Sequence, residues 1–214
     1  MTAAVLPIPR ARGEARARAL LREARRMFLE QGYERTNINE LVRRTGGSMA
    51  TLYRYYGGKA GLFTAMMEDV REELLAPLTR LGSAQDPPQV FLTRLGEAFL
   101  RLALSAEGVG FFRVLASEAY KFPELQQVVA RGFGQLTRHL SSYLDAQVAN
   151  GSLRLSDTRR AAGQFLEMVK GQAQLLAVMG LSHPLAESEL RAQVDSAVGL
   201  FLHGCSRGKT RRDE

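Results

Sequence analysis

The stretch that decides the fold is TNINELVRRTGGSMATLYRYYGGKAGLF, residues 36–63. Asn37 and Glu40 have the N-cap and N3 spacing that lets side chains satisfy free backbone amides at the start of a helix. Apolar side chains then recur on one face until a Gly-Gly pair breaks the helix. Two short helices joined by a glycine turn indicate a helix-turn-helix, whose second helix enters the DNA major groove.

The second helix of this pair starts after Ser48, a favourable N-cap residue, and Leu52 points from it into the core. Its exposed face carries the side chains that can read bases, which are Met49, Ala50, Thr51 and Arg54. The methyl groups of Ala50 and Thr51 suit the thymine methyl, and the Thr51 hydroxyl can bond a base edge or a phosphate. Arg54 has two open roles, a bidentate bond to guanine or a phosphate contact.

Over about fifty residues this region resembles the DNA-binding domain of the TetR (tetracycline-repressor-like) family. Three glycines, Gly47, Gly58 and Gly61, depart from the family pattern, and we expect them to loosen the turn and the next helix by roughly 0.5–1 kcal/mol each. The positions that match the family are Phe28, Gly32, Tyr33, Thr36, Ile38, Leu41, Gly46, Ser48, Thr51, Leu52, Tyr53, Tyr55, Tyr56, Lys59, Leu62 and Phe63.

The resemblance implies that hydroxyl and ammonium groups of the head grip the DNA backbone, a kind of contact that fixes register without reading bases. Of the neighbouring tyrosines, we expect Tyr53 and Tyr55 to contact phosphates and Tyr56 to lie in the core. Arg43 and Arg44 end the first helix of the pair and either contact DNA or stabilise that helix C-terminus. The predicted DNA-binding residues are Thr36, Arg43, Arg44, Ser48, Met49, Ala50, Thr51, Tyr53, Arg54, Tyr55 and Lys59.

The net charge of +7 is concentrated at one end of the chain. Residues 1–60 hold 12 of the 29 Lys and Arg residues and only 5 of the 22 Asp and Glu residues, so the remaining 154 residues are neutral overall. Excess positive charge on the segment with the helix-turn-helix is the pattern expected for phosphate binding. A merely solubilising surface is the other interpretation of this charge.

The sequence argues against several other classes of protein. Cys205 is the single cysteine, so no intrachain disulfide forms, and a reducing cytoplasm is the expected location. We find no long apolar run for a membrane span and no secretory signal. The three histidines are scattered, and no phosphate-binding loop or nucleophile elbow appears, so we expect no metal, no cofactor and no enzymatic activity.

The helical periodicity and turn signals predict an all-α fold of about nine helices, with a three-helix head and a larger helical body. Pro77 is expected to kink or end the fourth helix. The predicted helices are 14–31, 38–45, 48–54, 59–81, 88–106, 109–120, 122–150, 157–181 and 186–204. The predicted divisions are a flexible arm at 1–13, a DNA-binding domain at 14–58, a ligand-binding and dimerisation domain at 59–204 and a tail at 205–214.

Residues 111–181 resemble the C-terminal domain of the AefR-like subgroup of the same family. The resemblance implies a cavity in the body for a small, largely apolar effector that moves the fourth helix and changes the spacing of the heads. Arg113 and Glu118 can anchor polar groups of that effector or form structural salt bridges. The candidate lining residues are Phe99, Phe111, Phe112, Leu115, Phe133, Leu136 and Gln172, each of which can also be plain core.

One such head reads only a few base pairs, so we expect a two-fold homodimer on a pseudo-palindromic double-stranded DNA operator. The last two long helices each carry an apolar stripe, which is either core or a four-helix interface between two copies. The residues predicted for that interface are Phe165, Val169, Leu176, Met179, Val194, Val198, Phe201 and Leu202.

The sequence therefore indicates a DNA-binding transcriptional regulator, a repressor released from its operator by a small molecule. The alternative is a DNA-binding dimer without a small-molecule ligand, whose body serves only dimerisation or protein contacts.

Overall fold

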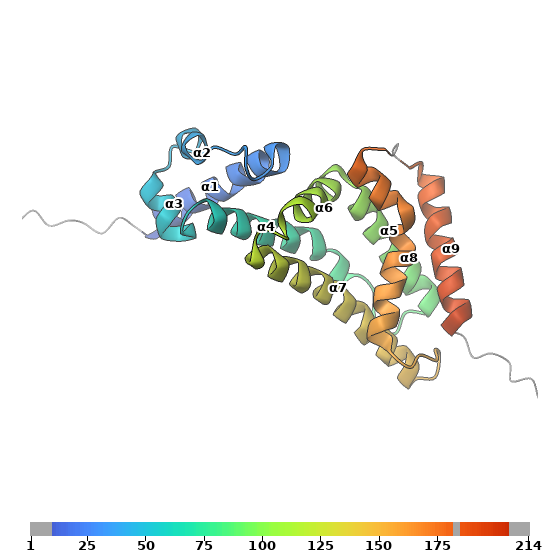
Figure 1. Ribbon diagram of the computed structural model, residues 1–214. Helices are drawn as coiled ribbons and strands as arrows, with labels where there is room; N and C mark the ends of the chain where they lie inside the picture. Colours follow the sequence, from blue (N-terminus) through green and yellow to red (C-terminus); the bar gives the residue numbers. More distant parts are fainter. Residues whose placement is uncertain (1–9, 182–184, 206–214) are drawn as a thin grey trace, which may run out of the picture. The chain divides into compact units, whose positions relative to one another are not determined.

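The computed structural model describes residues 10–181 and 185–205, and in this part of the chain every regular element is helical. The prediction of an all-α fold with about nine helices is confirmed. The elements (Figure 1) are α1 Arg10–Gln31, α2 Ile38–Arg44, α3 Met49–Tyr56, α4 Lys59–Leu75, the short 3₁₀ helix η1 Leu78–Arg80, α5 Pro88–Leu104, α6 Ala106–Glu118, α7 Pro123–Ala149, α8 Thr158–Met179 and α9 Glu187–Cys205.

The end of α4 and the start of α1 differ most from the predicted bounds. The fourth helix ends at Leu75, and a separate 3₁₀ turn follows Pro77, so the proline ends the regular part of the helix as predicted. The first helix begins at Arg10, so residues 10–13 of the predicted arm are helical instead of flexible. The high helix propensities of arginine and alanine outweigh the low propensity of the single Gly13. The rest of the arm, 1–9, and the tail from 206 lie outside the described residues.

The chain forms two compact units. The first, here called the head, holds residues 1–71 together with 114–129, and the second, the body, holds 72–113 and 130–214. The division therefore falls inside α4, α6 and α7. The domain boundary at 58/59 that we expect from the sequence remains a prediction.

In the head, α1 packs against both α2 and α3. The inner face of α1 presents Leu20, Ala24 and Phe28, which are fully buried, at the spacing of one helix face. Phe28 meets Phe63 of α4 with ring centroids 4.8 Å apart. Other buried side chains of the head core include Met27, Leu41, Leu52, Leu62, Met66, Met67 and Val70.

In the body, α5, α8 and α9 pack against one another around a shared apolar core. Gly96 of α5 makes the closest approach, because a Cβ there would lie 2.9 Å from the Val194 side chain of α9. A larger residue at this position would push the two helices apart. The buried side chains of this core come mainly from the stripes of these helices, and include Leu92, Leu95, Phe165, Val169, Val198 and Phe201.

α7 fastens the loop that precedes α5. The Tyr143 ring stacks on Phe91 with centroids 3.6 Å apart, and its hydroxyl donates to the Asp86 carbonyl at 2.8 Å. The buried Gln147 amide donates to the Ala84 carbonyl at 2.8 Å. Burial raises the pKa of Tyr143 to about 12, so this phenol stays protonated and keeps its donor at neutral pH.

α8 is broken in its middle. Gly171 has φ 52° and ψ −145°, a conformation outside the helical region that L-residues with a Cβ rarely adopt. The break leaves carbonyl groups without helical partners, and Gln193 of α9 satisfies two of them. Its side-chain amide donates to the carbonyls of Val169 at 2.6 Å and Lys170 at 3.0 Å.

Gly171→Ala should lower the free energy of unfolding by about 1–3 kcal/mol, because the new side chain is strained at positive φ. The matched control is Gly163→Ala in the regular part of α8, where an added Cβ meets nothing within 4 Å. That change should raise stability by about 0.5–1 kcal/mol. Urea unfolding followed by circular dichroism measures both, and equal stability of the two variants would contradict the break.

Candidate nucleic-acid interface

Local capping sets the geometry of the helix-turn-helix. Asn37 Oδ1 accepts hydrogen bonds from the backbone amides of Asn39 at 2.9 Å and Glu40 at 3.3 Å, as the sequence predicts. The Glu40 half of the predicted capping box is wrong, because its carboxylate accepts from Arg44. Ser48 caps α3 by accepting from the Thr51 amide at 3.2 Å, so the second predicted cap is confirmed.

Glycines close the turn between α3 and α4. Gly57, at φ 73°, donates its amide to the Tyr53 carbonyl at 2.9 Å and ends α3, while Gly58 follows at φ 128°. The turn is so tight that a Cβ on Gly61 would lie 1.7 Å from the Tyr56 carbonyl oxygen. We expected Gly58 and Gly61 to loosen this region, but the geometry instead requires glycine at both positions.

The outer face of α3 is open. Tyr53 is 59% exposed and Tyr55 38% exposed, and Ala50 and Arg54 are also exposed. Met49 and Thr51 are half-buried, and the Thr51 hydroxyl lies 3.0 Å from the Ser48 hydroxyl, with which it can share a hydrogen bond. Of the four residues expected to read bases, Ala50 and Arg54 are therefore exposed, while Met49 and Thr51 are only partly accessible.

The inner face of α3 holds the helix on α1. Leu52 is fully buried, and the Tyr56 hydroxyl donates to the Ala17 carbonyl at 2.8 Å. Burial raises the pKa of Tyr56, so the donor is retained. Tyr56 is thus a packing residue, in agreement with the sequence. The Tyr55 hydroxyl lies against Gly13, where an added Cβ would come within 2.6 Å of it.

Thr36 does not fit the role expected for it. Its side chain is buried, and its hydroxyl lies 2.8 Å from the Gly32 carbonyl and 3.3 Å from the Met27 carbonyl, to which it can donate. Because the Thr36 hydroxyl is bonded to carbonyls at the end of α1 and is buried, it is not available to a phosphate. We therefore correct the phosphate contact of Thr36 to a structural role, in which it joins α1 to the start of α2.

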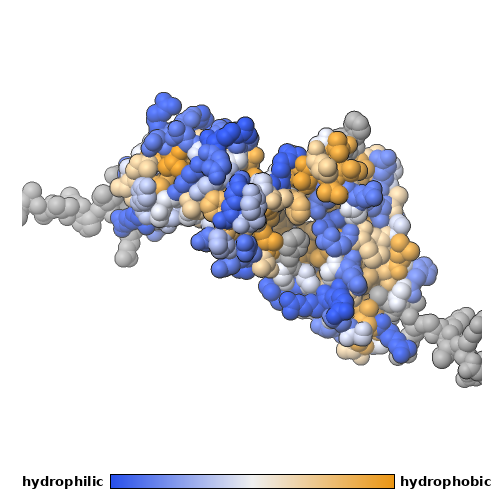
Figure 2. Space-filling view, in the orientation of Figure 1, coloured by the Kyte–Doolittle hydropathy of each residue, from blue (hydrophilic) through white to orange (hydrophobic). Residues whose placement is uncertain are grey.

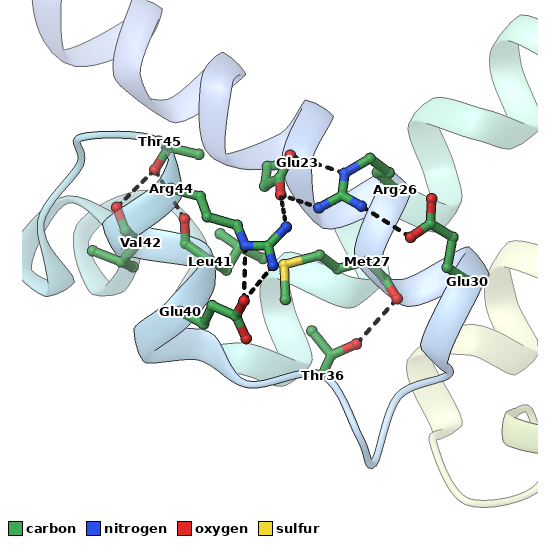
Figure 3. A network of polar contacts seen from close by, with 10 residues as sticks. All are labelled: Glu23, Arg26, Met27, Glu30, Thr36, Glu40, Leu41, Val42, Arg44 and Thr45. Atoms are coloured by element: carbon green, nitrogen blue, oxygen red, sulfur yellow. Dashed lines mark hydrogen bonds and ion pairs between the residues drawn. The ribbon is translucent and has the colours of Figure 1, made fainter.

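The two arginines at the end of α2 have different surroundings. Arg44 donates to the Glu40 carboxylate and lies 3.5 Å from the Glu23 carboxylate of α1, so it ties α2 to α1 (Figure 3). Hydrogen bonds from Arg26 hold the pKa of Glu23 below its ordinary value, so this carboxylate stays charged at neutral pH. Arg43 is exposed at the same helix end. The geometry leaves Arg43 as the DNA candidate and gives Arg44 a structural role.

Lys59 begins α4 and is half-buried. Its ammonium donates to the Glu34 carbonyl at 3.2 Å and lies 4.6 Å from the centre of the Tyr33 ring. Burial lowers the pKa of Lys59, an effect opposed by the negative charges of Glu34 and Glu118. This lysine can bind a phosphate through its remaining donors while the Tyr33 ring supports it.

The candidate ligand-lining residues have different surroundings, and their role in binding an effector stays a prediction. Phe99, Phe111 and Phe112 are half-buried in the body, Leu136 belongs to its closed core and Gln172 is exposed. A pocket of about 440 Å³ in the body is open to solvent and has charged side chains in its lining. It is lined by Ala130, Gly134, Thr137, Asp157, Arg159 and Arg160. Leu115 belongs to the head, and the Phe133 side chain lies outside the described residues.

The two residues weighed as polar anchors have structural partners. Glu118 pairs with Lys121 at 3.3 Å, so its salt bridge is confirmed. Arg113 donates to the carbonyls of Val178 at 3.0 Å and Ala177 at 3.3 Å and thereby caps the end of α8. Arg113 therefore adds a donor to the Ala177 carbonyl, which already accepts from the Gly180 amide, and supplies one to the Val178 carbonyl at the helix C-terminus.

Most residues predicted for the dimer interface lie inside the chain's own core. Phe165, Val169, Val194, Val198 and Phe201 are buried where α5 packs onto α8 and α9, and Leu202 packs against the same core. The stripe we assigned to a second copy is therefore covered by α5. Leu176 and Met179 remain exposed, the latter at 61%. Figure 2 shows the hydrophobic surface at the end of α8, to which Leu175 and Leu181 also contribute.

Two families match the chain. Residues 20–66 match the family described as bacterial regulatory proteins, tetR family, and residues 91–204 match the AefR-like transcriptional repressor, C-terminal domain. The chain belongs to the TetR family. It is thus a DNA-binding transcriptional regulator and not an enzyme, and regulators of this family bind DNA as dimers.

Individual relatives agree with this assignment. The nucleoid occlusion factor SlmA of Haemophilus influenzae is 29% identical over 147 residues, which cover 67% of this chain and 66% of that protein. The solved structure of the flavonoid-responsive regulator FrrA is 27% identical with a TM-score of 0.73, covering 94% of this chain and 100% of FrrA. A TetR regulator from Agrobacterium tumefaciens shares the fold, with a TM-score of 0.74 at 20% identity over 91% of this chain and 96% of that one.

The described residues contain neither a membrane-spanning helix nor a group of side chains suited to a metal ion. No helix in them is long and apolar enough to cross a membrane. Among the same residues no three or more His, Cys, Asp or Glu side chains are grouped so that they could hold a metal ion.

Tyr53→Phe should weaken operator binding about tenfold across sequences, because it removes one hydroxyl that is free to donate to a phosphate, a bond worth about 1.5–3 kcal/mol at most. Tyr56→Phe is the matched control, since its hydroxyl is already bonded to Ala17 and its loss should lower stability instead. Fluorescence anisotropy and thermal unfolding separate the two effects. Unchanged DNA affinity of the Tyr53 variant would remove it from the interface.

Proposed function

We propose that the chain is a homodimeric repressor that binds a pseudo-palindromic operator and is released from it by a small, largely apolar molecule. The observation that carries the DNA-binding part is the open outer face of α3, where Ala50, Tyr53 and Arg54 are exposed together on the basic head. The likeness of residues 91–204 to a repressor domain supports repression over activation. Each head recognises one half of the operator, so two copies are needed.

Selection of bound duplexes from a random DNA pool, carried out at two salt concentrations, tests this reading of the operator. A palindromic motif is expected, with affinity that falls steeply as salt rises because phosphate contacts release counterions. Recovery of no motif at either concentration would contradict sequence-specific binding by α3.

The proposed response to a small molecule depends on the body of the chain. FrrA, which is similar over nearly the whole chain, is described as flavonoid-responsive. Three half-buried phenylalanines in the body, Phe99, Phe111 and Phe112, have the aromatic character that a planar apolar effector would contact. Titration of the labelled operator complex with a panel of flavonoids and other small aromatic compounds tests this. We expect release of the operator by at least one compound.

A second candidate is a DNA-binding dimer that responds to no small molecule. The open character of the 440 Å³ pocket, with charged side chains in its lining, and the similarity to nucleoid occlusion factors favour it. Operator complexes that persist with every compound, together with a body that gains no thermal stability from any of them, would favour this candidate over the first.

For the dimer, we propose the outward faces of α8 and α9 in place of their buried stripes. Leu200 of α9 is 66% exposed, and Met179 and Leu175 of α8 are 61% and 59% exposed, which makes each of them a suitable anchor. Leu200→Glu should raise the dimer dissociation constant at least about 30-fold, since loss of a central apolar anchor costs about 2 kcal/mol or more. Sedimentation velocity measures this, with Val90→Glu, an exposed valine of α5, as the control. A fully dimeric Leu200 variant would rule this face out.

A further inference from the structure

The corner between α6 and α7 belongs to the head, although the sequence assigns it to the body. Residues 114–129 form one compact unit with residues 1–71. Val114, Leu115, Leu125 and Val128 anchor this segment as buried side chains. The corner itself is closed by the Glu118 carbonyl, which accepts from the amides of Lys121 at 2.9 Å and Phe122 at 3.3 Å.

Phe122 at this corner contacts two rings of the head. Its centroid lies 4.5 Å from that of Tyr33, in an edge-to-face arrangement, and 6.0 Å from that of Phe63. Tyr33 also lies 4.9 Å from Phe63 and stacks on Phe28 at 5.9 Å. Tyr33 therefore has aromatic neighbours from α1, α4 and the α6–α7 corner, and such pairs fix ring orientation beyond simple burial.

The Tyr33 ring in turn supports Lys59. The ammonium lies 4.6 Å from the ring centroid, within the range of a cation–π contact, and the bond to the Glu34 carbonyl holds it from a second direction. A displaced Tyr33 ring would no longer make this contact with the partly desolvated ammonium of Lys59. The chain of contacts runs from Phe122 to Tyr33 to Lys59.

We propose that Phe122 is a positioning residue for DNA binding, which fixes the phosphate-binding ammonium of Lys59 through the Tyr33 ring. This inference rests on the proposed contact between Lys59 and a phosphate. The corner is continuous with α6 and α7, whose other residues belong to the body.

A double-mutant cycle on DNA affinity tests this, with a random-sequence duplex of about 30 base pairs as the probe because a phosphate contact also contributes to non-specific binding. Lys59→Met should reduce the slope of log affinity against log salt by about one. Phe122→Leu should lower affinity about 3- to 10-fold and reduce the same slope, while in the Lys59→Met background it should have no further effect. Phe122→Tyr keeps the ring and should retain affinity.

Tyr120→Leu is the matched control, since Tyr120 lies in the same corner but is 74% exposed, and it should leave affinity and slope unchanged. Phe122→Met, which keeps apolar volume without a ring, replaces Phe122→Leu if the leucine variant fails to fold. Independent, additive losses from Phe122 and Lys59, or an unaffected Phe122 variant, would overturn the inference alone. An unaffected Lys59 variant would overturn the phosphate contact as well, and a wild-type chain without salt-dependent binding would overturn the proposed function itself.

Discussion

The hydrogen bond from the Tyr56 hydroxyl to the Ala17 carbonyl, with Leu52 buried beside it, holds the DNA-reading helix in place. α3 has only eight residues, and isolated helices of that length are unstable in water. Its outer face must stay bare to meet DNA, so the packing energy comes from the inner face alone. Caps at both ends, from Ser48 and Gly57, satisfy backbone groups that the two ends of this short helix leave free. The orientation of the base-reading side chains thus depends on how α3 sits on α1.

The basic residues of the head divide into two groups with different tasks. Arg26 and Arg44 are committed to carboxylates of α1 and α2 and stabilise the head, whereas Arg43 and Arg54 are exposed beside the turn and on α3. Each surface pair is worth little alone, but the shared Glu23 links them into one network across two helices (Figure 3). The carboxylates offset these two arginines in the net charge of +7, so the excess positive charge lies on other residues. The electrostatic field of all the charges steers the protein toward DNA. The affinity for phosphates comes from the cations that are not paired with carboxylates.

Sequence reasoning succeeded where the cause is local and failed where a distant segment decides. The caps at Asn37 and Ser48 and the stop at Pro77 follow from neighbouring residues, and all three were predictable. Thr36 matches a family pattern and Arg44 ends a basic helix, yet their partners on α1 determine that they are structural. The stripes of α8 and α9 could not be divided between core and interface, because their periodicity is the same whether α5 or a second copy covers them. Phe122 gave no signal at all, since its importance comes from Tyr33, far earlier in the chain.

The break at Gly171 lets one helix serve two purposes in the body. Before it, α8 buries Phe165 and Val169 in the core, and after it the helix exposes Leu175 and Met179. Gln193 of α9 donates to carbonyls just before the break, and Arg113 of α6 donates to a carbonyl near the end of α8, so only the helix end is held from α6. α6 itself continues from Arg113 to Glu118, beside the corner that supports Lys59. α6 thus contributes Arg113 to the body and Glu118 to the head, and its backbone is continuous between them.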